Sequence, residues 1–153
     1  MASGMNKHEI RELLSELLSQ QALAVLATQA SHGPYTTLVG FVSSGDLKHI
    51  SFVTSRSTRK YAALKATPGV SMLIDSRTNR TSDFSDAVAV TALGKAHEIE
   101  KEEHEDIVSL YLAKHPHLED FVSSPTCALI RVEVEEYIVV TRFQKVMTLD
   151  MRS

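Results

Sequence analysis

The sequence lacks the residues and motifs that several classes of protein require. Its single cysteine, Cys127, cannot form an internal disulfide or build a thiolate metal site alone, which favours a reducing compartment. An apolar strand pattern follows Cys127, which is typical of a buried, inert thiol rather than a nucleophile. No apolar run is long enough to cross a membrane, and the N-terminus has no signal-peptide core. A nucleophile elbow, a P-loop and a dinucleotide fingerprint are also missing.

The net charge and the length of the chain narrow the class of protein and the number of domains. The net charge is −3 with no basic block, which argues against a nucleic-acid partner. A chain of 153 residues supports one hydrophobic core, so we expect a single domain over residues 1–153. Met5 could be the biological start, which would make residues 1–4 a cloning remnant. We expect a cytoplasmic protein with no membrane partner.

Strand patterns outnumber helical ones. A capping box of Asn6 and Glu9 begins an N-terminal helix with a leucine stripe, and an acidic helix is expected over residues 101–114. Gly94 lies inside a strand pattern and indicates a bulge or a close backbone approach. Strands are expected at residues 22–28, 35–43, 48–54, 70–75, 87–98, 127–134 and 137–143. We therefore expect a mainly β (α+β) fold, in which six to seven antiparallel strands form a barrel with peripheral helices.

The segment from Phe52 to Lys60 has the pattern of a phosphate-binding turn between a strand and a helix. It contains four hydroxyl groups and three cations, and Ser57 or Thr58 can cap the following helix. A helix N-terminus attracts phosphate through its unpaired N–H groups and its partial positive charge. Arg59 can bind two phosphate oxygens, and Lys60 adds a point charge. A capped surface helix with solvated cations would have the same spacing.

The same segment resembles the F-x-T-x-x-x-S/T-R-K motif of the pyridoxamine 5′-phosphate oxidase-like family of FMN-binding split β-barrels. The resemblance covers roughly residues 22–115 and is carried by an ordered set of segments rather than by one motif. These segments are A-V-L-A-T from Ala24, G-P-Y-T-T-L-V from Gly33, P-G-V-S-M-L-I from Pro68 and V-T-A-L-G-K-A from Val90. The resemblance implies a split barrel that binds FMN as a homodimer, with the cofactor sites at the interface.

The resemblance also assigns cofactor residues. Thr54, Ser55, Arg59 and Lys60 would meet the phosphate of FMN. The backbone of Thr37, Leu38 and Val39 would run beside the isoalloxazine ring and offer N–H and C=O groups to its polar edge. The donor-rich connection at residues 76–86 would reach the partner subunit's cofactor, with Arg77 and Asn79 as the candidates. A solvated loop with incidental arginines is the alternative for that connection.

Departures from the family pattern bear on the substrate. Thr37 and Val42 stand where the oxidase has an arginine and a lysine, and Ala89 stands where it has a glutamine. His115 replaces its substrate-phosphate arginine, whereas the nearby tyrosine is retained as Tyr111. Loss of these cations argues against genuine pyridoxine phosphate oxidation. Tyr111 and His115 are the candidate substrate residues.

Function is therefore expected to be that of an FMN-dependent oxidoreductase acting on an unknown small molecule, with no catalytic side chain assigned. One alternative is a non-catalytic module that holds flavin or haem, which some related split barrels bind through a histidine. A deazaflavin (F420) is a third possibility, although its longer anionic tail would need more cations. The histidines, including His115 and His117, lack the spacing of a metal site, so no metal is expected.

Overall fold

The computed structural model describes residues 4–142 and 145–152. The strands are β1 (Leu23–Ala30), β2 (Gly33–Ser43), β3 (His49–Ser55), β4 (Gly69–Asp75), β5 (Ala89–Ile99), β6 (Cys127–Thr141) and β7 (Lys145–Asp150). The α-helices are α1 (Lys7–Gln20), α2 (Arg59–Ala66), α3 (Asp83–Asp86), α4 (Glu105–Lys114) and α5 (Glu119–Ser123). Two 3-10 turns, η1 (Lys101–Glu103) and η2 (Pro116–Leu118), flank α4, so the helix expected from residue 101 begins instead at Glu105.

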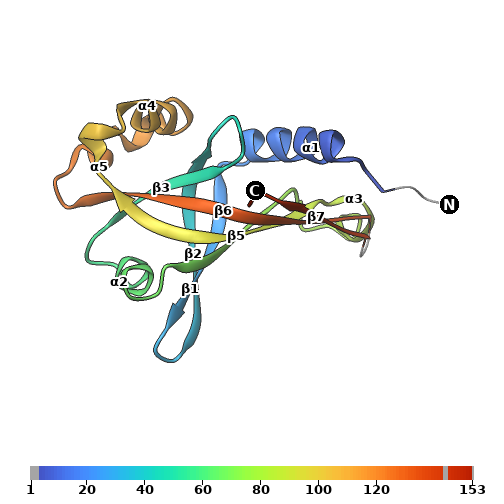
Figure 1. The fold of residues 1–153 in the computed structure, drawn as a ribbon, viewed down its shortest axis with the longest axis horizontal. Helices are drawn as coiled ribbons and strands as arrows, with labels where there is room; N and C mark the ends of the chain where they lie inside the picture. Colours follow the sequence, from blue (N-terminus) through green and yellow to red (C-terminus); the bar gives the residue numbers. More distant parts are fainter. Residues whose placement is uncertain (1–3, 143–144, 153) are drawn as a thin grey trace.

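Six strands form a closed antiparallel barrel, and the expected fold class is confirmed. The strand order is β2-β1-β4-β5-β6-β3, and the barrel closes because β3 pairs with both β2 and β6. Helices α2, α4 and α5 lie around the barrel, whereas β7 and α3 lie at the opposite end of the molecule (Figure 1). Alternating burial along β1 and β4 follows the pleat and directs every second side chain into the core.

Strand β6 differs from the expectation. Its 15 residues form one continuous strand, so the division into strands at 127–134 and 137–143 was wrong. One edge pairs with β5 from Leu129 to Val140, whereas the other edge pairs with β3 up to Glu133 and with β7 from Glu136 onward. The sequence break at Glu135–Glu136 thus marks a change of partner rather than the end of a strand. Strand β7 was not expected, and Phe143 lies outside the described residues.

A bulge at this change of partner confirms the expectation for Gly94. In the pairing of β5 with β6, Leu93 faces Glu136 and Gly94 faces Val134, so Glu135 is skipped. A Cβ atom at Gly94 would lie 2.2 Å from the carbonyl oxygen of Glu133. Only glycine permits this approach, and the close contact lets β6 bend from the barrel toward β7.

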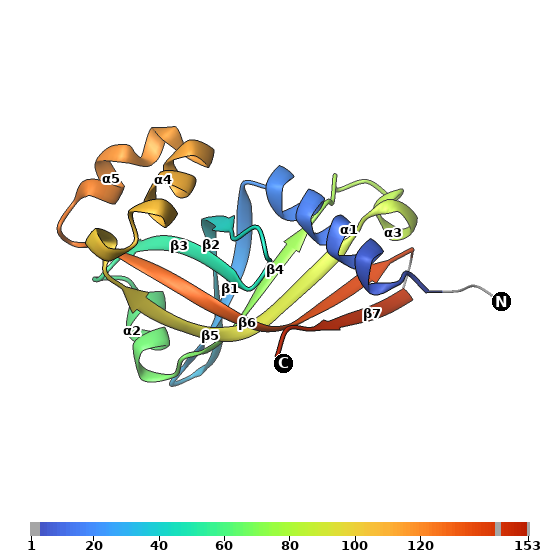
Figure 2. The same cartoon turned by 45° about the horizontal axis from the view of Figure 1, so that its top comes forward.

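The N-terminal helix α1 lies across the sheet at the β7 end (Figure 2). Its capping box is confirmed: the Asn6 side chain accepts from the Glu9 N–H, and the Glu9 carboxylate accepts from the Asn6 N–H. Ile10, Leu14, Leu17 and Leu18 are buried in the main core. The leucine stripe therefore covers the inner face of the sheet, as the helical spacing of the stripe indicates.

A second, smaller core lies between α4, α5 and the barrel. It contains Val53, Tyr111, Val122, Cys127 and Leu129. Burial raises the pKa of the Cys127 thiol, which matches the expectation of an unreactive cysteine. None of the helices within the described ranges combines the length and hydropathy needed to span a bilayer.

Candidate functional site

The turn between β3 and α2 is held by its own hydroxyl groups. Thr58 is the N-cap of α2, because its Oγ1 accepts from the Tyr61 N–H at 3.3 Å. The Oγ1 atoms of Thr54 and Thr58 lie 2.9 Å apart, and the Oγ atoms of Ser55 and Ser57 lie at the same separation. The cap therefore falls on Thr58, one of the two expected residues, and the hydroxyls fix the shape of the turn.

A carboxylate from β5 also holds this turn. Arg56 donates to Glu98 Oε2 at 2.6 Å and to the Pro125 carbonyl at 2.8 Å, while the Tyr61 hydroxyl donates to Glu98 Oε1 at 2.5 Å. Burial alone would raise the pKa of Glu98, but the bonds from Arg56 and Tyr61 outweigh it and lower the pKa. Arg56, one of the three cations of the motif, is therefore a structural residue. Sequence reasoning had no signal for Glu98, which is 42 residues from Arg56.

The other two cations of the motif remain without a carboxylate partner. The first turn of α2 contains no acidic residue, and no ion pair within residues 4–142 and 145–152 includes Arg59 or Lys60. Arg59 is exposed, and its guanidinium lies 5.7 Å from the centre of the Tyr35 ring on β2. Lys60 is half-buried, and burial lowers its pKa. Two unpaired cations at a helix N-terminus create a positive site.

Strand β2 has an open edge next to these cations. It pairs with β1 from Gly33 to Gly40 but with β3 only from Phe41 to Ser43. The stretch that contains Thr37, Leu38 and Val39 therefore has a strand neighbour on one side only. Every second backbone N–H and C=O group on the unpaired side is available for another partner.

Side chains along this stretch differ in exposure. Leu38 is 65% exposed, and Val39 is buried in the core. The Thr37 hydroxyl is buried without a hydrogen-bond partner, and its atom has no contact with solvent. A ligand beside β2 would therefore meet the backbone of these residues and the Leu38 side chain rather than the Thr37 hydroxyl.

Tyr111 and His115 lie together, but they are buried. Their exposed fractions are 1% and 3%, and their ring centres are 4.8 Å apart. Tyr111 donates to the Gly40 carbonyl at 3.1 Å, and His115 Nε2 donates to the Phe41 carbonyl at 2.9 Å. Gly40 permits this approach, since a Cβ atom there would lie 3.3 Å from both side chains. This burial counts against the expected contact with a substrate, and both residues instead fix α4 against β2.

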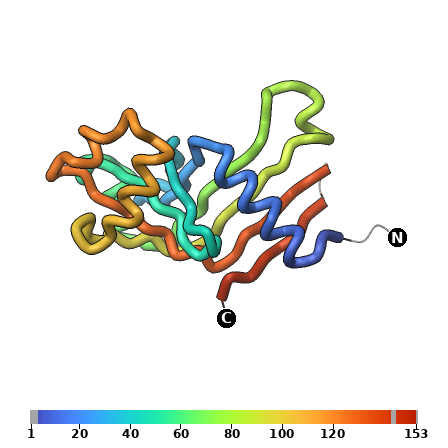
Figure 3. The backbone as a smooth tube through the Cα atoms, turned by 90° about the horizontal axis from the view of Figure 1, so that it is seen from above, coloured from blue at the N-terminus to red at the C-terminus, as the bar shows by residue number. Residues whose placement is uncertain are grey.

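Arg77 and Asn79 lie away from the other candidate residues. Their connection between β4 and β5 projects from the sheet at the end opposite α2 (Figure 3). Arg77 forms an ion pair with Asp75 at 2.9 Å, and the Asn79 N–H donates to Asp83 at 2.7 Å. Within one chain, the structure thus brings the β2 and α2 candidates together but leaves these two apart. Among the residues that the structure describes, no group of His, Cys, Asp and Glu side chains could hold a metal ion.

Comparison with known proteins identifies the family. Residues 8–141 match the pyridoxamine 5′-phosphate oxidase family, so the chain belongs to that family. A comparison with curated proteins gives no match. The family assignment covers the barrel, α1, α2 and α4, and it confirms the resemblance inferred from the sequence.

Solved structures share the fold at low sequence identity. A haem-binding protein from Mycobacterium smegmatis has a TM-score of 0.82 at 15% identity, over 95% of this chain and 60% of that chain. The haem storage protein HutZ from Vibrio cholerae has a TM-score of 0.71 at 17% identity, over 86% and 93% of the two chains. An FAD-binding protein from Mesorhizobium loti has a TM-score of 0.67 at 15% identity, over 84% and 90%. This chain thus spans less than two thirds of the M. smegmatis protein.

Proposed function

We propose that this protein binds FMN and acts as a flavin-dependent oxidoreductase on a small molecule. The observation that carries the proposal is the pair of unpaired cations, Arg59 and Lys60, at the N-terminus of α2 beside the open edge of β2. Membership in the pyridoxamine 5′-phosphate oxidase family supports it. Electron transfer is the chemistry that the flavin supplies when bound.

The phosphate would lie at the start of α2. A dianion there would offset the cost of keeping the half-buried Lys60 charged, and it would raise the lowered pKa of this residue. Arg59 can bind phosphate oxygens as a fork while its guanidinium stays over Tyr35. Thr54 and Ser55 would act by fixing the turn, because their hydroxyls already bond to Thr58 and Ser57.

The ring system would lie along β2. Backbone groups of Thr37, Leu38 and Val39 on the unpaired edge would orient its polar end, and the exposed Leu38 side chain would cover an apolar part. N–H donors near the pyrimidine end favour the reduced anion and so tune the reduction potential. No side chain need act as a strong acid or base for this role.

We further propose that the working unit is a homodimer with shared cofactor sites. An apolar area on the outer face of the sheet supports this: Leu23 and Leu38 are 55% and 65% exposed. Val25 lies on the same face, next to Leu38 on one side and Leu73 on the other. A second copy could cover this area and bring Arg77 and Asn79 of one subunit toward the cofactor of the other.

The substrate would not be pyridoxine phosphate. Thr37 and Val42 supply no cation, and His115 donates to the Phe41 carbonyl in the core. A second phosphate-bearing ligand would therefore lack charge partners at these three positions. A neutral or weakly charged small molecule fits the site better.

Titration of the purified protein with FMN and with riboflavin tests the proposal. We expect FMN to bind at about one per subunit with quenching of flavin fluorescence, and riboflavin to bind more weakly because it has no phosphate. An absorption spectrum separates the alternatives, since haem, FMN and deazaflavin absorb in different bands. Sedimentation should give about twice the 16.9 kDa chain mass. A haem spectrum, or no quenching at micromolar protein, would reject the flavin.

A further inference from the structure

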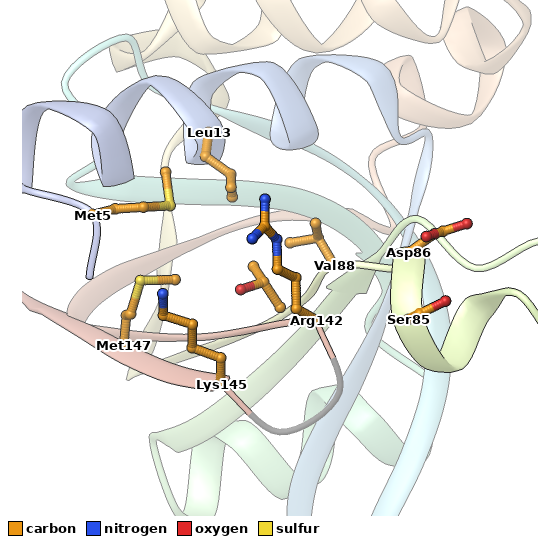
Figure 4. Close-up of a pocket in the computed structure, with 9 residues that line it drawn as sticks. Met5, Leu13, Ser85, Asp86, Val88, Arg142, Lys145 and Met147 are labelled. Carbon is orange, nitrogen blue, oxygen red and sulfur yellow. The ribbon is translucent and has the colours of Figure 1, made fainter. Parts of the chain in front are cut away.

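A cavity of about 450 Å³ lies at the end of the sheet opposite α2, where α1, α3 and the β6–β7 hairpin meet. Its lining comes from segments that are far apart in the sequence. The lining residues are Met5, Leu13, Ser85, Asp86, Val88, Thr141, Arg142, Lys145 and Met147 (Figure 4). Small-molecule sites in proteins have volumes in this range, roughly 300–1,000 Å³.

Four of the nine lining residues form an apolar face of the cavity. Met5, Leu13, Val88 and Met147 are partly buried and pack against the main hydrophobic core. Two of these four side chains are methionines, which adapt to the shape of a ligand because they are flexible and polarisable. The walls could therefore hold an apolar ligand body next to the core.

Two cations complete the lining. Arg142 has a left-handed backbone with φ of 43°, and its guanidinium is directed between Leu13 and Val88 (Figure 4). Lys145 lies on β7 and lines the cavity beside Met147. The Asp86 side chain points away from Arg142 in the same view, and no ion pair in the described part of the chain includes Arg142. Arg142 is exposed as a residue, and a guanidinium without a carboxylate partner can bind an incoming anion through its N–H groups.

We propose that this cavity binds a small organic anion with an apolar body, of the class of medium-chain carboxylates. The apolar body lies against Met5, Leu13, Val88 and Met147, and the carboxylate binds Arg142 with Lys145 nearby. A highly charged ligand fits poorly because Met5, Leu13, Val88 and Met147 form an apolar face and Asp86 adds a negative charge to the lining. The site does not depend on the proposed flavin site, which lies beside α2 at the other end of the molecule.

The methionines provide a direct test. In protein labelled with ¹³C at the methionine methyl groups, octanoate should shift the Met5 and Met147 signals and leave Met72 unchanged, because Met72 is fully buried in β4. Octanol and octylamine have the same apolar body without the negative charge. We expect octanoate to bind about tenfold or more tightly than either, since a charge-assisted hydrogen bond contributes that much. Equal affinity for all three would overturn the anion site, and no shift at millimolar octanoate would overturn the cavity site.

Two matched variants test whether Arg142 binds the carboxylate of the ligand. Arg142→Gln should weaken octanoate about tenfold and leave octanol unchanged, whereas Arg80→Gln, at an exposed arginine that does not line the cavity, should change neither. An unshifted Met72 signal shows that each variant is folded. The same titration with FMN present should give the same octanoate affinity. Equal weakening in both variants, or displacement of octanoate by FMN, would contradict a separate anion site.

Discussion

Strand β6 lies between β5 and β3 at its Cys127 end but between β5 and β7 at its Thr141 end. The first end belongs to a closed barrel, where β6 has a strand partner on both edges and bonds from Arg56 and Tyr61 to Glu98 hold the turn between β3 and α2. The second end belongs to an open sheet that α1 covers with side chains. Barrel closure thus fixes the position of the turn between β3 and α2, whereas the packing of α1 on the open sheet leaves a cavity between elements.

The cations at the two ends reflect this difference. At the closed end, Glu98 binds Arg56 and Tyr61, so the turn is fixed while Arg59 and Lys60 stay unpaired. At the open end, Arg142 and Lys145 line a cavity. Lys145 belongs to β7, the edge strand, which pairs with β6. A site of fixed shape suits one defined cofactor, and an adaptable cavity suits a class of similar ligands.

The largest expected effect on ligand affinity comes from removing the two unpaired cations at the closed end. Arg59→Ala with Lys60→Ala should weaken FMN about a hundredfold or more, because each charge-assisted bond to phosphate contributes about 1.5–3 kcal/mol. Riboflavin should be affected little. Lys7→Ala with Arg11→Ala removes the same charge from the exposed face of α1 and should leave FMN binding unchanged. Fluorescence titration measures all of these, and equal weakening of FMN and riboflavin would contradict the phosphate role.

The next effect concerns the bend that separates the two ends. Gly94→Ala places a Cβ atom 2.2 Å from the Glu133 carbonyl oxygen, so β6 must move. We expect the free energy of unfolding to fall by about 3 kcal/mol, as measured by urea denaturation. Gly69→Ala is the matched control, because no atom lies within 4 Å of its Cβ position. Similar stability of the two variants would show that the bulge does not require the close approach.

Glu98→Gln loosens the turn without removing a ligand-binding cation. We expect FMN affinity to fall by severalfold, up to about tenfold, since the turn loses its charged bond to Arg56. Stability should also lose part of its pH dependence. The pKa of Glu98 is lowered in the folded chain, so its contribution is present above the unfolded pKa and is lost as pH falls through the folded pKa. Unchanged FMN binding and an unchanged acid-unfolding profile would refute a positioning role.

The smallest effect involves the contact between α4 at the closed end and α1 at the open end. Lys114 donates to the Leu18 carbonyl at 2.8 Å and lies 3.8 Å from the Phe41 ring centre, and burial lowers its pKa to about 8. Between pH 8 and about 10 the unfolded chain retains a proton that the folded chain has released, so stability should rise with pH. We expect a rise below about 1 kcal/mol because the side chain is only half-buried. Urea unfolding at pH 7.5 and 9.5 should show this rise, and Lys114→Met should lack it.

Much of the fold could be predicted from local sequence patterns. The capping box at Asn6, the leucine stripe of α1, the Thr58 cap and the bulge at Gly94 all depend on neighbouring residues or on one residue type. The continuous β6 could not be predicted, because the polar pair Glu135–Glu136 has the pattern of a turn. Its extended backbone is decided by β5 on one edge and by successive partners on the other.

Within the candidate site, the sequence alone determined which residue types stand at the start of α2 and along β2. Only the tertiary structure decided what each of them does. Arg56 is bound by the Glu98 carboxylate from β5 and so is not available to a ligand. Tyr111 and His115 are buried against β2, and the Arg59 guanidinium lies over the Tyr35 ring. The cavity between α1 and β7 likewise has no sequence signature. Local patterns reveal periodicity and capping, whereas the availability of a charge depends on groups that the barrel brings together from distant parts of the chain.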